Sequence, residues 1–255
     1  MIQLLIDAGN SRVKWRLLRD GRAGRVHAVA WSATSAARVS RRIMREGAAA
    51  ARILVCSVAS SALERALRRA ARTTRLTLPL FIRSARRAAG VRNGYADTWR
   101  LGADRWVAMI GARALLPAAA LCIVDIGTAM TIDLVDASGR HRGGLLVPGP
   151  TLMVEALLRH TAGIRRRAGG RAPSRSRAVF AHSTRSGLQS GSELAAAALI
   201  ERALREAAAL LGRRPRLLLA GGGASRVAPR LGVRAKRVDD LVLRGLGVLG
   251  AGHSG

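Results

Sequence analysis

Two segments of the chain carry the same short pattern, an aspartate followed two residues later by a glycine. Asp7-Ala8-Gly9-Asn10-Ser11 follows the apolar run IQLLI, and Asp125-Ile126-Gly127-Thr128 follows the apolar run LCIV. A glycine in such a turn lets backbone N–H groups converge on an anion, and amide or hydroxyl side chains add donors. A carboxylate alone repels phosphate, so Asp7 and Asp125 indicate a cation such as Mg²⁺ between protein and phosphate. Plain hairpin turns are the alternative, since Asp and Gly are common in turns.

A third loop, Ala220-Gly221-Gly222-Gly223, follows the apolar run RLLL. Three glycines allow a flat ligand such as adenine to lie directly on the backbone. A simple turn from a strand into a helix is the alternative interpretation.

The elements that must position these loops occur twice in the same order. Residues 2–18 predict a β-hairpin whose turn is Asp7 to Ser11, and a matching hairpin follows 118 positions later around Asp125. A strand, a small-residue loop and a helix are then predicted from Arg52 and again from Arg216. Such a duplication is typical of a two-domain α/β protein with a cleft between its halves, and we expect domains at 1–117 and 118–255.

The rest of the chain adds helices and one basic segment. Helices are predicted over residues 101–116, 151–160 and 193–211, and the arginine-rich segment 163–177 is expected to be a solvated, mobile loop. A GxGxxG pattern occurs at residues 245–250, but too few residues follow it for a dinucleotide-binding unit. We expect a C-terminal packing helix or strand there instead.

Several functional classes are excluded by what the sequence lacks. It has no Walker A motif and no HExxH or HxxxH pair, and Cys56 and Cys122 each lie in an apolar run, as expected for buried thiols rather than a disulfide or zinc site. No apolar run approaches the roughly 20 residues that span a bilayer. We therefore expect a reduced, cytoplasmic protein with no membrane partner.

The charge is the unusual feature of the composition. Lys+Arg 44 against Asp+Glu 15 gives a formal net charge of +29, and all the basic residues except Lys14 and Lys236 are arginines. This charge suggests an anionic partner such as nucleic acid. However, the chain is also rich in Ala and Gly, which share GC-rich codons with Arg, and its seven aromatic residues are few for a protein that stacks on bases. A specific nucleic-acid partner is therefore not expected.

Together the three loops resemble the phosphate-one, phosphate-two and adenosine motifs of the actin, Hsp70 and sugar-kinase superfamily. The resemblance implies a duplicated actin-like (ribonuclease H-like) α/β fold with two domains and a nucleotide cleft between them. The block GVRNGYADTWRLGADRW at residues 90–106 and the segment GGLLVPG at 143–149 narrow the match. With DAGNS and DIGTA, they closely resemble the type III pantothenate kinase family, some members of which are named Bvg accessory factor.

The resemblance implies ATP-dependent phosphorylation of pantothenate to 4′-phosphopantothenate, the first step of coenzyme A synthesis. It implies Mg²⁺ with ATP, a monovalent cation (K⁺ or NH₄⁺) and a homodimer. The residues that it assigns to ATP are Asp7, Ala8, Gly9, Asn10, Ser11, Arg12, Val13, Lys14 and Thr128. Those that it assigns to pantothenate are Tyr95, Gly102, Ala103, Asp104, Arg105 and Thr184. Asp125 is implied as the ligand of the monovalent cation, and Asp7 as a ligand of Mg²⁺.

Asp104 is the expected proton acceptor. Phosphorylating an alcohol requires a base for the hydroxyl proton, and a carboxylate kept ionised by Arg105 suits this role. An acid in a first helical turn is the structural alternative. Arg105 and Lys14 can donate to a carboxylate or to phosphate, and a solvated surface charge is their alternative.

One segment departs from the family pattern, and two other functions stay open. The family often has a Gly-Lys-Asn-Thr-like stretch before the substrate-contacting threonine, whereas this chain has Ala181-His182-Ser183-Thr184. A catalytically weak regulatory or nucleic-acid-associated protein with the same fold is one alternative function. A kinase for another small alcohol is the other.

Overall fold

The computed structural model describes residues 1–169 and 179–252. Its contacts divide the chain into two compact units. Unit 1 comprises Met1–Ala118, Gly139–His141 and the segment from Asp240 onward, and unit 2 comprises Ala119–Ser138 and the described part of Arg142–Asp239. The expected domain limits at 1–117 and 118–255 stay a prediction. Two later segments, Gly139–His141 and the one that starts at Asp240, pack with the N-terminal unit.

Unit 1 is built on a mixed sheet with the strand order β3-β2-β1-β5-β6, with β4 also paired to β2. Its strands are β1 Ile2–Ala8, β2 Arg12–Arg19, β3 Arg22–Ala23, β4 His27–Ala30, β5 Arg52–Ser57 and β6 Leu80–Ile82. β1 and β2 are antiparallel with Asp7 opposite Lys14, which confirms the first hairpin. β1 and β5 are parallel with Asp7 beside Cys56.

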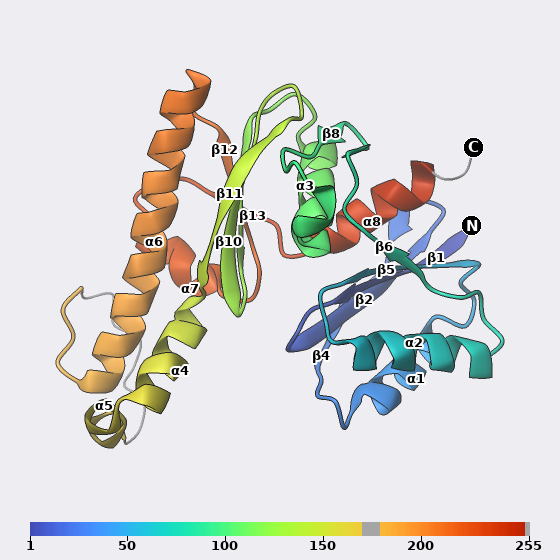
Figure 1. Ribbon diagram of the computed structural model, residues 1–255, viewed down its shortest axis with the longest axis horizontal. Helices are drawn as coiled ribbons and strands as arrows, with labels where there is room; N and C mark the ends of the chain where they lie inside the picture. The colour runs from blue at the N-terminus through green and yellow to red at the C-terminus, as the bar shows by residue number, and fades with distance from the viewer. Residues whose placement is uncertain (170–178, 253–255) are drawn as a thin grey trace. The chain divides into compact units, whose positions relative to one another are not determined.

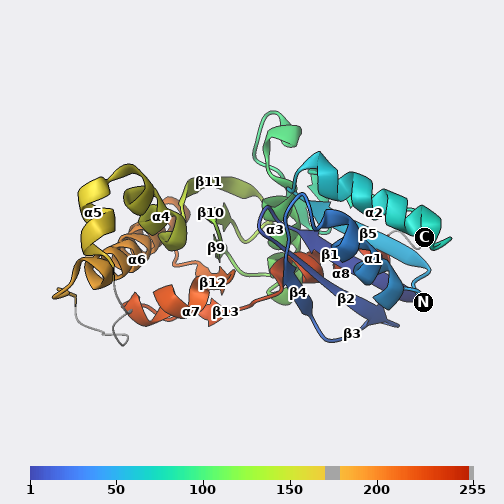
Figure 2. The same cartoon turned by 90° about the horizontal axis from the view of Figure 1, so that it is seen from below.

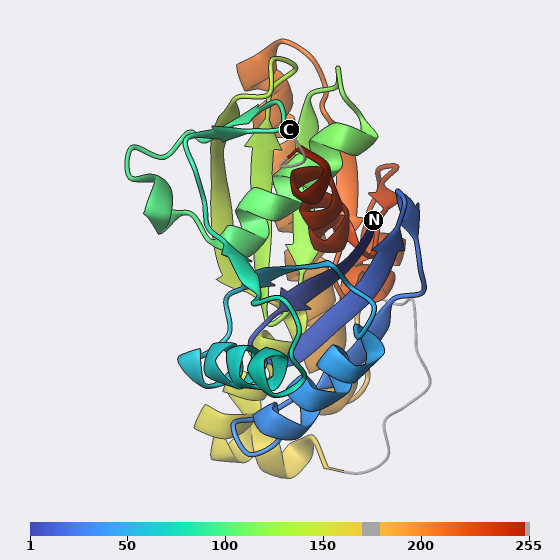
Figure 3. The same ribbon diagram turned by 90° about the vertical axis from the view of Figure 1, so that its right-hand side faces the viewer.

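Helices cover both faces of this sheet (Figures 1 and 2). α1 Ala36–Glu46 and α2 Ser61–Thr73 lie side by side on one face. α3 Ala103–Leu115 and α8 Leu241–Gly252 pack against each other and against the other face, where Figure 3 shows the dark red α8 next to the green α3. Three short elements join α2 to α3: β7 Arg87–Ala88, β8 Val91–Arg92 and the 3₁₀ helix η1 Thr98–Arg100.

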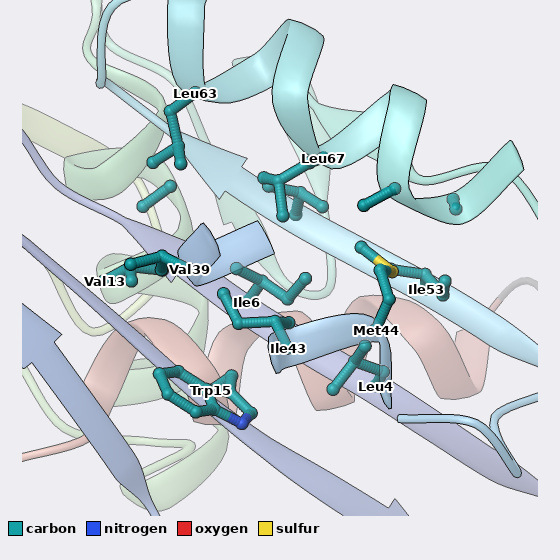
Figure 4. Packing of buried hydrophobic residues seen from close by; sticks show 14 of the residues in the cluster. Leu4, Ile6, Val13, Trp15, Val39, Ile43, Met44, Ile53, Leu63 and Leu67 are labelled. Carbon is teal, nitrogen blue, oxygen red and sulfur yellow. The ribbon is translucent and has the colours of Figure 1, made fainter. Parts of the chain in front are cut away.

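The core on the α1 and α2 side comes from the alternation of the strands. Leu4 and Ile6 of β1 point to the same face and meet Ile43 of α1 and Leu63 of α2, all fully buried (Figure 4). Trp15 of β2 closes this cluster, and its indole N–H donates to Glu46 at 2.8 Å. The hydrogen bond satisfies the polar edge of an otherwise apolar side chain.

Glycines set the spacing between α3 and α8. A Cβ on Gly245 of α8 would clash with the Val107 carbonyl of α3, and a Cβ on Gly111 of α3 would clash with the Leu241 carbonyl of α8. The GxGxxG pattern therefore serves helix packing, which confirms the expected C-terminal packing element.

Unit 2 holds a second sheet with the order β11-β10-β9-β12-β13. Its strands are β9 Leu121–Ile126, β10 Ala129–Val135, β11 His141–Pro148, β12 Arg216–Ala220 and β13 Lys236–Arg237. β9 and β10 are antiparallel, and β9 and β12 are parallel with Ala220 beside Asp125, so the second hairpin is also confirmed. Its helical elements are α4 Pro150–His160, α5 Ala162–Arg167, α6 Thr184–Leu211, α7 Ala224–Val227 and η2 Ala228–Arg230.

The predicted helices occur, with two differences. α3 and α4 agree with the expectation to within two residues, but α6 begins at Thr184, well before the predicted start at residue 193. The expectation of a mobile loop over residues 163–177 is wrong for its first part, since Ala162–Arg167 form α5. Residues 170–178 of that segment lie outside the described residues. Within the described ranges, none of the helices has the length and apolar character needed to cross a membrane.

Candidate active site

The charges of Asp7 and Asp104 both influence the pKa of one buried thiol in unit 1, that of Cys56. Burial raises the pKa of Cys56 well above its usual value, the negative charges of Asp7 and Asp104 raise it further, and Arg83 opposes them. Asp7 lies beside Cys56 on the neighbouring strand, and Asp104 stands in the first turn of α3. Since such electrostatic effects weaken with distance, the charge of Asp104 reaches the strand end that carries Asp7. The structure thus brings together two residues that the sequence separates widely.

The turn after Asp7 is closed by its own backbone. The N–H of Gly9 donates to the Arg12 carbonyl at 3.0 Å, and the Trp31 indole donates to the Gly9 carbonyl at 2.8 Å. The Gly9 amide is therefore used within the turn, while Asn10 and Ser11 are exposed. Trp31 was not a predicted site residue, because no motif links it to the turn that it supports.

Asp104 is held at the N-terminus of α3. Its Oδ1 accepts a hydrogen bond from the Arg105 amide at 2.8 Å, and a Cβ on Gly102 would lie 2.6 Å from the same oxygen. Gly102 therefore leaves the space that the carboxylate occupies. The partial positive charge of a helix N-terminus stabilises a carboxylate in this place.

Arg105 and Tyr95 are in direct contact. Nη1 of Arg105 donates to the Tyr95 hydroxyl at 3.2 Å, although the Arg105 side chain is only 6% exposed. The Tyr95 amide donates to the side chain of buried Asn93 at 2.9 Å. The ring of Tyr95 stacks on the ring of His141, with centroids 5.7 Å apart. Sequence reasoning missed Asn93, which lies in the quoted RNGY block, and His141, which no motif connects to Tyr95.

In unit 2 the glycine-rich loop lies directly on the turn that follows Asp125. Gly221 has φ +84°, and a Cβ there would clash with Oδ1 of Asp125. The Gly223 amide donates to the Ile126 carbonyl at 2.9 Å, and the Gly149 amide donates to the Thr128 carbonyl at 2.8 Å. Three loops of this unit thus meet at the turn that follows Asp125, and Gly221 allows the backbone to lie directly beside the Asp125 carboxylate.

A pocket of about 330 Å³ lies next to these loops in unit 2. It is lined by residues of α4, α6 and α7: Pro150, Thr151, Val154, Glu155, Gln189, Ser192, Glu193 and Arg226. Nη2 of Arg226 donates to the Thr151 hydroxyl at 2.6 Å, which joins α7 to the start of α4. Arg226 and Thr151 carry no motif, so the sequence did not indicate them.

Thr184 is the first residue of α6, where the Ser183 side chain caps the helix by accepting from the Ser186 amide. It belongs to unit 2, whereas the other residues that the resemblance assigns to pantothenate belong to unit 1.

The candidate cation ligands are single carboxylates. Among residues 1–169 and 179–252, no group of three or more His, Cys, Asp or Glu side chains could hold a metal ion. A cation that accompanies a nucleotide needs no such cage, because one or two carboxylates and the phosphates complete its shell. Asp7 and Asp125, each at the end of a strand, are carboxylates of the type such binding uses.

Several solved structures resemble this chain in fold over nearly its whole length. A putative 2-dehydro-3-deoxygalactonokinase from Sinorhizobium meliloti has a TM-score of 0.60 at 16% identity, covering 98% of both chains. A putative Baf family transcriptional activator from Campylobacter jejuni has a TM-score of 0.58 at 17% identity, also covering 98% of both chains. At these identities the likeness concerns the fold alone, and it establishes the actin-like α/β fold for this chain.

Relatives found by sequence comparison share a higher percentage of identical residues with this chain. A type III pantothenate kinase of Xanthomonas campestris pv. campestris is 41% identical over 247 residues, which covers 96% of each chain. One of Nitrosococcus oceani is 33% identical over 247 residues, covering 95% of this chain and 91% of the relative. The profile of the family described as type III pantothenate kinase matches residues 3–206. The chain belongs to the type III pantothenate kinase family.

Proposed function

We propose that Asp104 is the general base for the reaction of this family, the transfer of a phosphoryl group from ATP to the primary hydroxyl of pantothenate. Family membership supports the reaction, and the observation that carries the assignment is the place of Asp104 in the first turn of α3, beside Gly102 and hydrogen-bonded to the Arg105 amide. A phosphate-binding turn and a base must adjoin each other if a hydroxyl is to attack the γ-phosphorus.

The chemical step is an in-line displacement. The hydroxyl oxygen of pantothenate forms a bond to the γ-phosphorus while the bond from that phosphorus to the β,γ-bridging oxygen breaks, so ADP leaves. The hydroxyl proton passes to the Asp104 carboxylate, which accepts a hydrogen bond from the Arg105 amide at the N-terminus of α3. The products are 4′-phosphopantothenate and ADP.

The ATP phosphates would lie along the turn of residues 7–14, and the family resemblance also assigns Thr128 to ATP. Lys14 lies opposite Asp7 in the hairpin, so a cation and an anion stand at the same level of the sheet. Asp7 would hold Mg²⁺ and Asp125 a monovalent cation, K⁺ or NH₄⁺. A bound cation neutralises phosphate charge.

The adenosine would occupy unit 2. The three glycines at 221–223 present bare backbone, and the pocket lined by Thr151 and Arg226 adjoins them. Arg226 lies at the surface of this pocket, where its guanidinium can stack on a base or contact a phosphate.

Pantothenate would be bound through its carboxylate by the pair of Arg105 and Tyr95. A guanidinium presents its donors in one fixed plane, which matches the geometry of a carboxylate. Ala103 and Gly102 would contact the substrate through their backbone. Thr184 would contact it near the two-fold axis of a homodimer.

An assay of ADP release with pantothenate, run with and without K⁺, tests the reaction. Asp104→Asn should lower kcat by roughly 10²-fold or more, the size of a general-base effect, while ATP binding measured by titration stays near that of the parent protein. The matched control is Asp20→Asn, an exposed acid of the same unit whose positive φ of 47° suits Asn. Near-parental turnover of Asp104→Asn would contradict the role of the base. Phosphorylation of other small alcohols but not pantothenate would contradict the substrate.

A further inference from the structure

We propose that His141 is a positioning residue for substrate binding, which acts by holding Tyr95 and through it Arg105. The inference rests on the proposed pantothenate site. It extends that site to a residue in the second half of the sequence, the first residue of β11.

His141 and Tyr95 form a nearly parallel ring stack. Their planes are inclined by 14°, and the His141 side chain is only 1% exposed. A buried ring with one face on the tyrosine restricts the rotation of that tyrosine about its side-chain bonds. The hydroxyl of Tyr95 then meets Nη1 of Arg105 at 3.2 Å, so the position of one ring fixes an acceptor for the guanidinium.

The backbone around His141 packs closely against the segment of residues 90–94. A Cβ on Gly94 would clash with the His141 carbonyl, and a Cβ on Gly139 would clash with the Gly90 carbonyl. The Arg92 amide also donates to the Gly139 carbonyl at 2.9 Å. Residues 139–141 therefore lie against the 90–95 segment and belong to unit 1, although their neighbours in sequence belong to unit 2. These contacts fix the backbone at His141, and its imidazole ring stacks on Tyr95.

The orientation of Tyr95 matters for binding more than for the chemical step. The Tyr95 and Arg105 pair would hold the carboxylate of pantothenate, at the end of the molecule away from the reacting hydroxyl. Loss of the stack should therefore weaken binding of pantothenate and leave ATP binding and the base largely unchanged.

The first test measures KM and kcat in three variants. His141→Leu and His141→Ala should raise the KM for pantothenate by about tenfold, the upper range for an aromatic stack, with the KM for ATP unchanged and kcat within about threefold. His141→Phe keeps a ring in place and should restore most of the affinity. His27→Ala is the matched control, because His27 stacks on Trp15 in the same unit with centroids 5.5 Å apart, outside the proposed site.

The second test observes Tyr95 itself. Tyr95 is the only tyrosine of the chain, so labelling with 3-fluorotyrosine gives a single ¹⁹F resonance. This resonance should shift or broaden in His141→Leu and change little in His27→Ala. Titration with pantothenate should move the signal of the parent protein, and should require about tenfold more ligand in His141→Leu.

The outcomes separate the two proposals. A parental protein that does not phosphorylate pantothenate overturns the proposed function, while the ¹⁹F spectrum of His141→Leu still decides whether His141 holds Tyr95. An unchanged ¹⁹F signal, or an unchanged KM for pantothenate in folded His141→Leu, overturns the role of His141. Equal losses in His141→Phe and His141→Leu would show that the ring stack is not the cause. If His141→Ala fails to fold, the leucine and phenylalanine variants carry the same test, because they fill the buried volume.

Discussion

Cys56 and Cys122 illustrate how burial decides the chemistry of single residues in this chain. Both thiols are buried, and neither forms a disulfide. Burial raises the pKa of Cys122, and together with a smaller contribution from the nearby Asp133 carboxylate it brings the pKa to about 12. The thiolate is the nucleophilic form, so both cysteines are inert in the folded protein at neutral pH.

The raised pKa of Cys122 predicts a loss of stability in alkali. The unfolded thiol ionises near 9.0 while the folded thiol keeps its proton until about 12, so the unfolded state binds fewer protons across this interval. The free energy of unfolding should then fall by up to about 1.4 kcal/mol per pH unit from this residue. Below pH 9 the two states are protonated alike and the contribution is constant.

Urea unfolding of the parent protein and of Cys122→Ala at pH 8, 9, 10 and 11 measures this slope. The variant loses packing at every pH, but its decline between pH 9 and 11 should be shallower. Parallel curves for the two proteins would show that Cys122 ionises as readily folded as unfolded.

At the site, sequence reasoning identified the residues with polar chemistry and missed those that support them. Asp7, Asp104 and Tyr95 belong to motifs with recognisable spacing. Trp31 and His141 do not, because each acts by packing against a residue distant in sequence. A local pattern carries no information on such contacts, which arise only when the chain folds.

At the scale of elements, α8 is tied to the sheet of unit 1 by an ion-pair network. Asp240 contacts Arg16 of β2 and Arg244 of α8, each at 2.7 Å, and the Arg16 side chain is only 5% exposed. Burial raises the pKa of the Asp240 carboxyl, but the hydrogen bond from Arg244 and the charge of Arg16 outweigh this effect and lower the pKa overall. The network fixes the first residue of the C-terminal segment to β2.

Asp240→Asn should destabilise the protein, because it leaves the buried Arg16 guanidinium without its counter-charge. The expected loss is about 3 kcal/mol, the lower end of the range for breaking a buried pair, since Asp240 keeps some contact with water. Urea denaturation measures the loss. In the parent protein, the stability supplied by the Asp240 charge is present above the usual pKa of 3.8 and is lost as the pH falls through the lower folded pKa.

Asp239→Asn is the neighbouring control. Asp239 is 59% exposed and pairs with Arg237 at the surface, where ion pairs contribute little. Equal effects of the two substitutions would contradict the anchoring role of Asp240.

The glycines of α8 give a second prediction at this scale. Gly245→Ala should cost about 1–3 kcal/mol, because its Cβ meets the Val107 carbonyl and the two helices must separate. Gly247→Ala should be neutral or stabilise by up to about 1 kcal/mol, since its Cβ would meet only side-chain carbons at 3.4 and 3.6 Å and alanine favours a helix. Thermal unfolding of the two variants measures the difference. A stable Gly245→Ala would show that α3 and α8 do not depend on close packing.

Among the elements, the hairpins were predictable and some helix limits were not. A glycine turn between alternating strands is a local signal, and both hairpins have it. The start of α6 at Thr184 was missed because residues 184–192 are rich in Ser and Gly, which favour helices weakly, and Ser183 supplies a cap that the sequence alone did not single out. α5 was missed because an arginine-rich stretch has no apolar periodicity.

At the scale of the whole molecule, the net charge of +29 must be explained for a member of a kinase family. The proposed chemistry uses few basic residues: Lys14, Arg105, Arg12 and Arg226. The remaining positive charge raises the local concentration of anions, including ATP and pantothenate. Screening at a Debye length of about 8 Å in physiological salt limits this effect.

The same charge predicts weak, sequence-insensitive binding to DNA. Each phosphate that an arginine neutralises releases a counterion, so the association constant should fall by orders of magnitude between about 50 and 200 mM salt. Fluorescence anisotropy with two duplexes of different sequence, each titrated at several salt concentrations, measures this dependence. The two duplexes should bind alike, with dissociation constants of about 10⁻⁶ M or weaker at physiological salt. Inorganic polyphosphate, which offers phosphates without bases, should compete as well as DNA does. Tight binding of one duplex at physiological salt, resistant to polyphosphate, would instead mean that the charge is arranged to recognise a nucleic acid in addition to the kinase substrates.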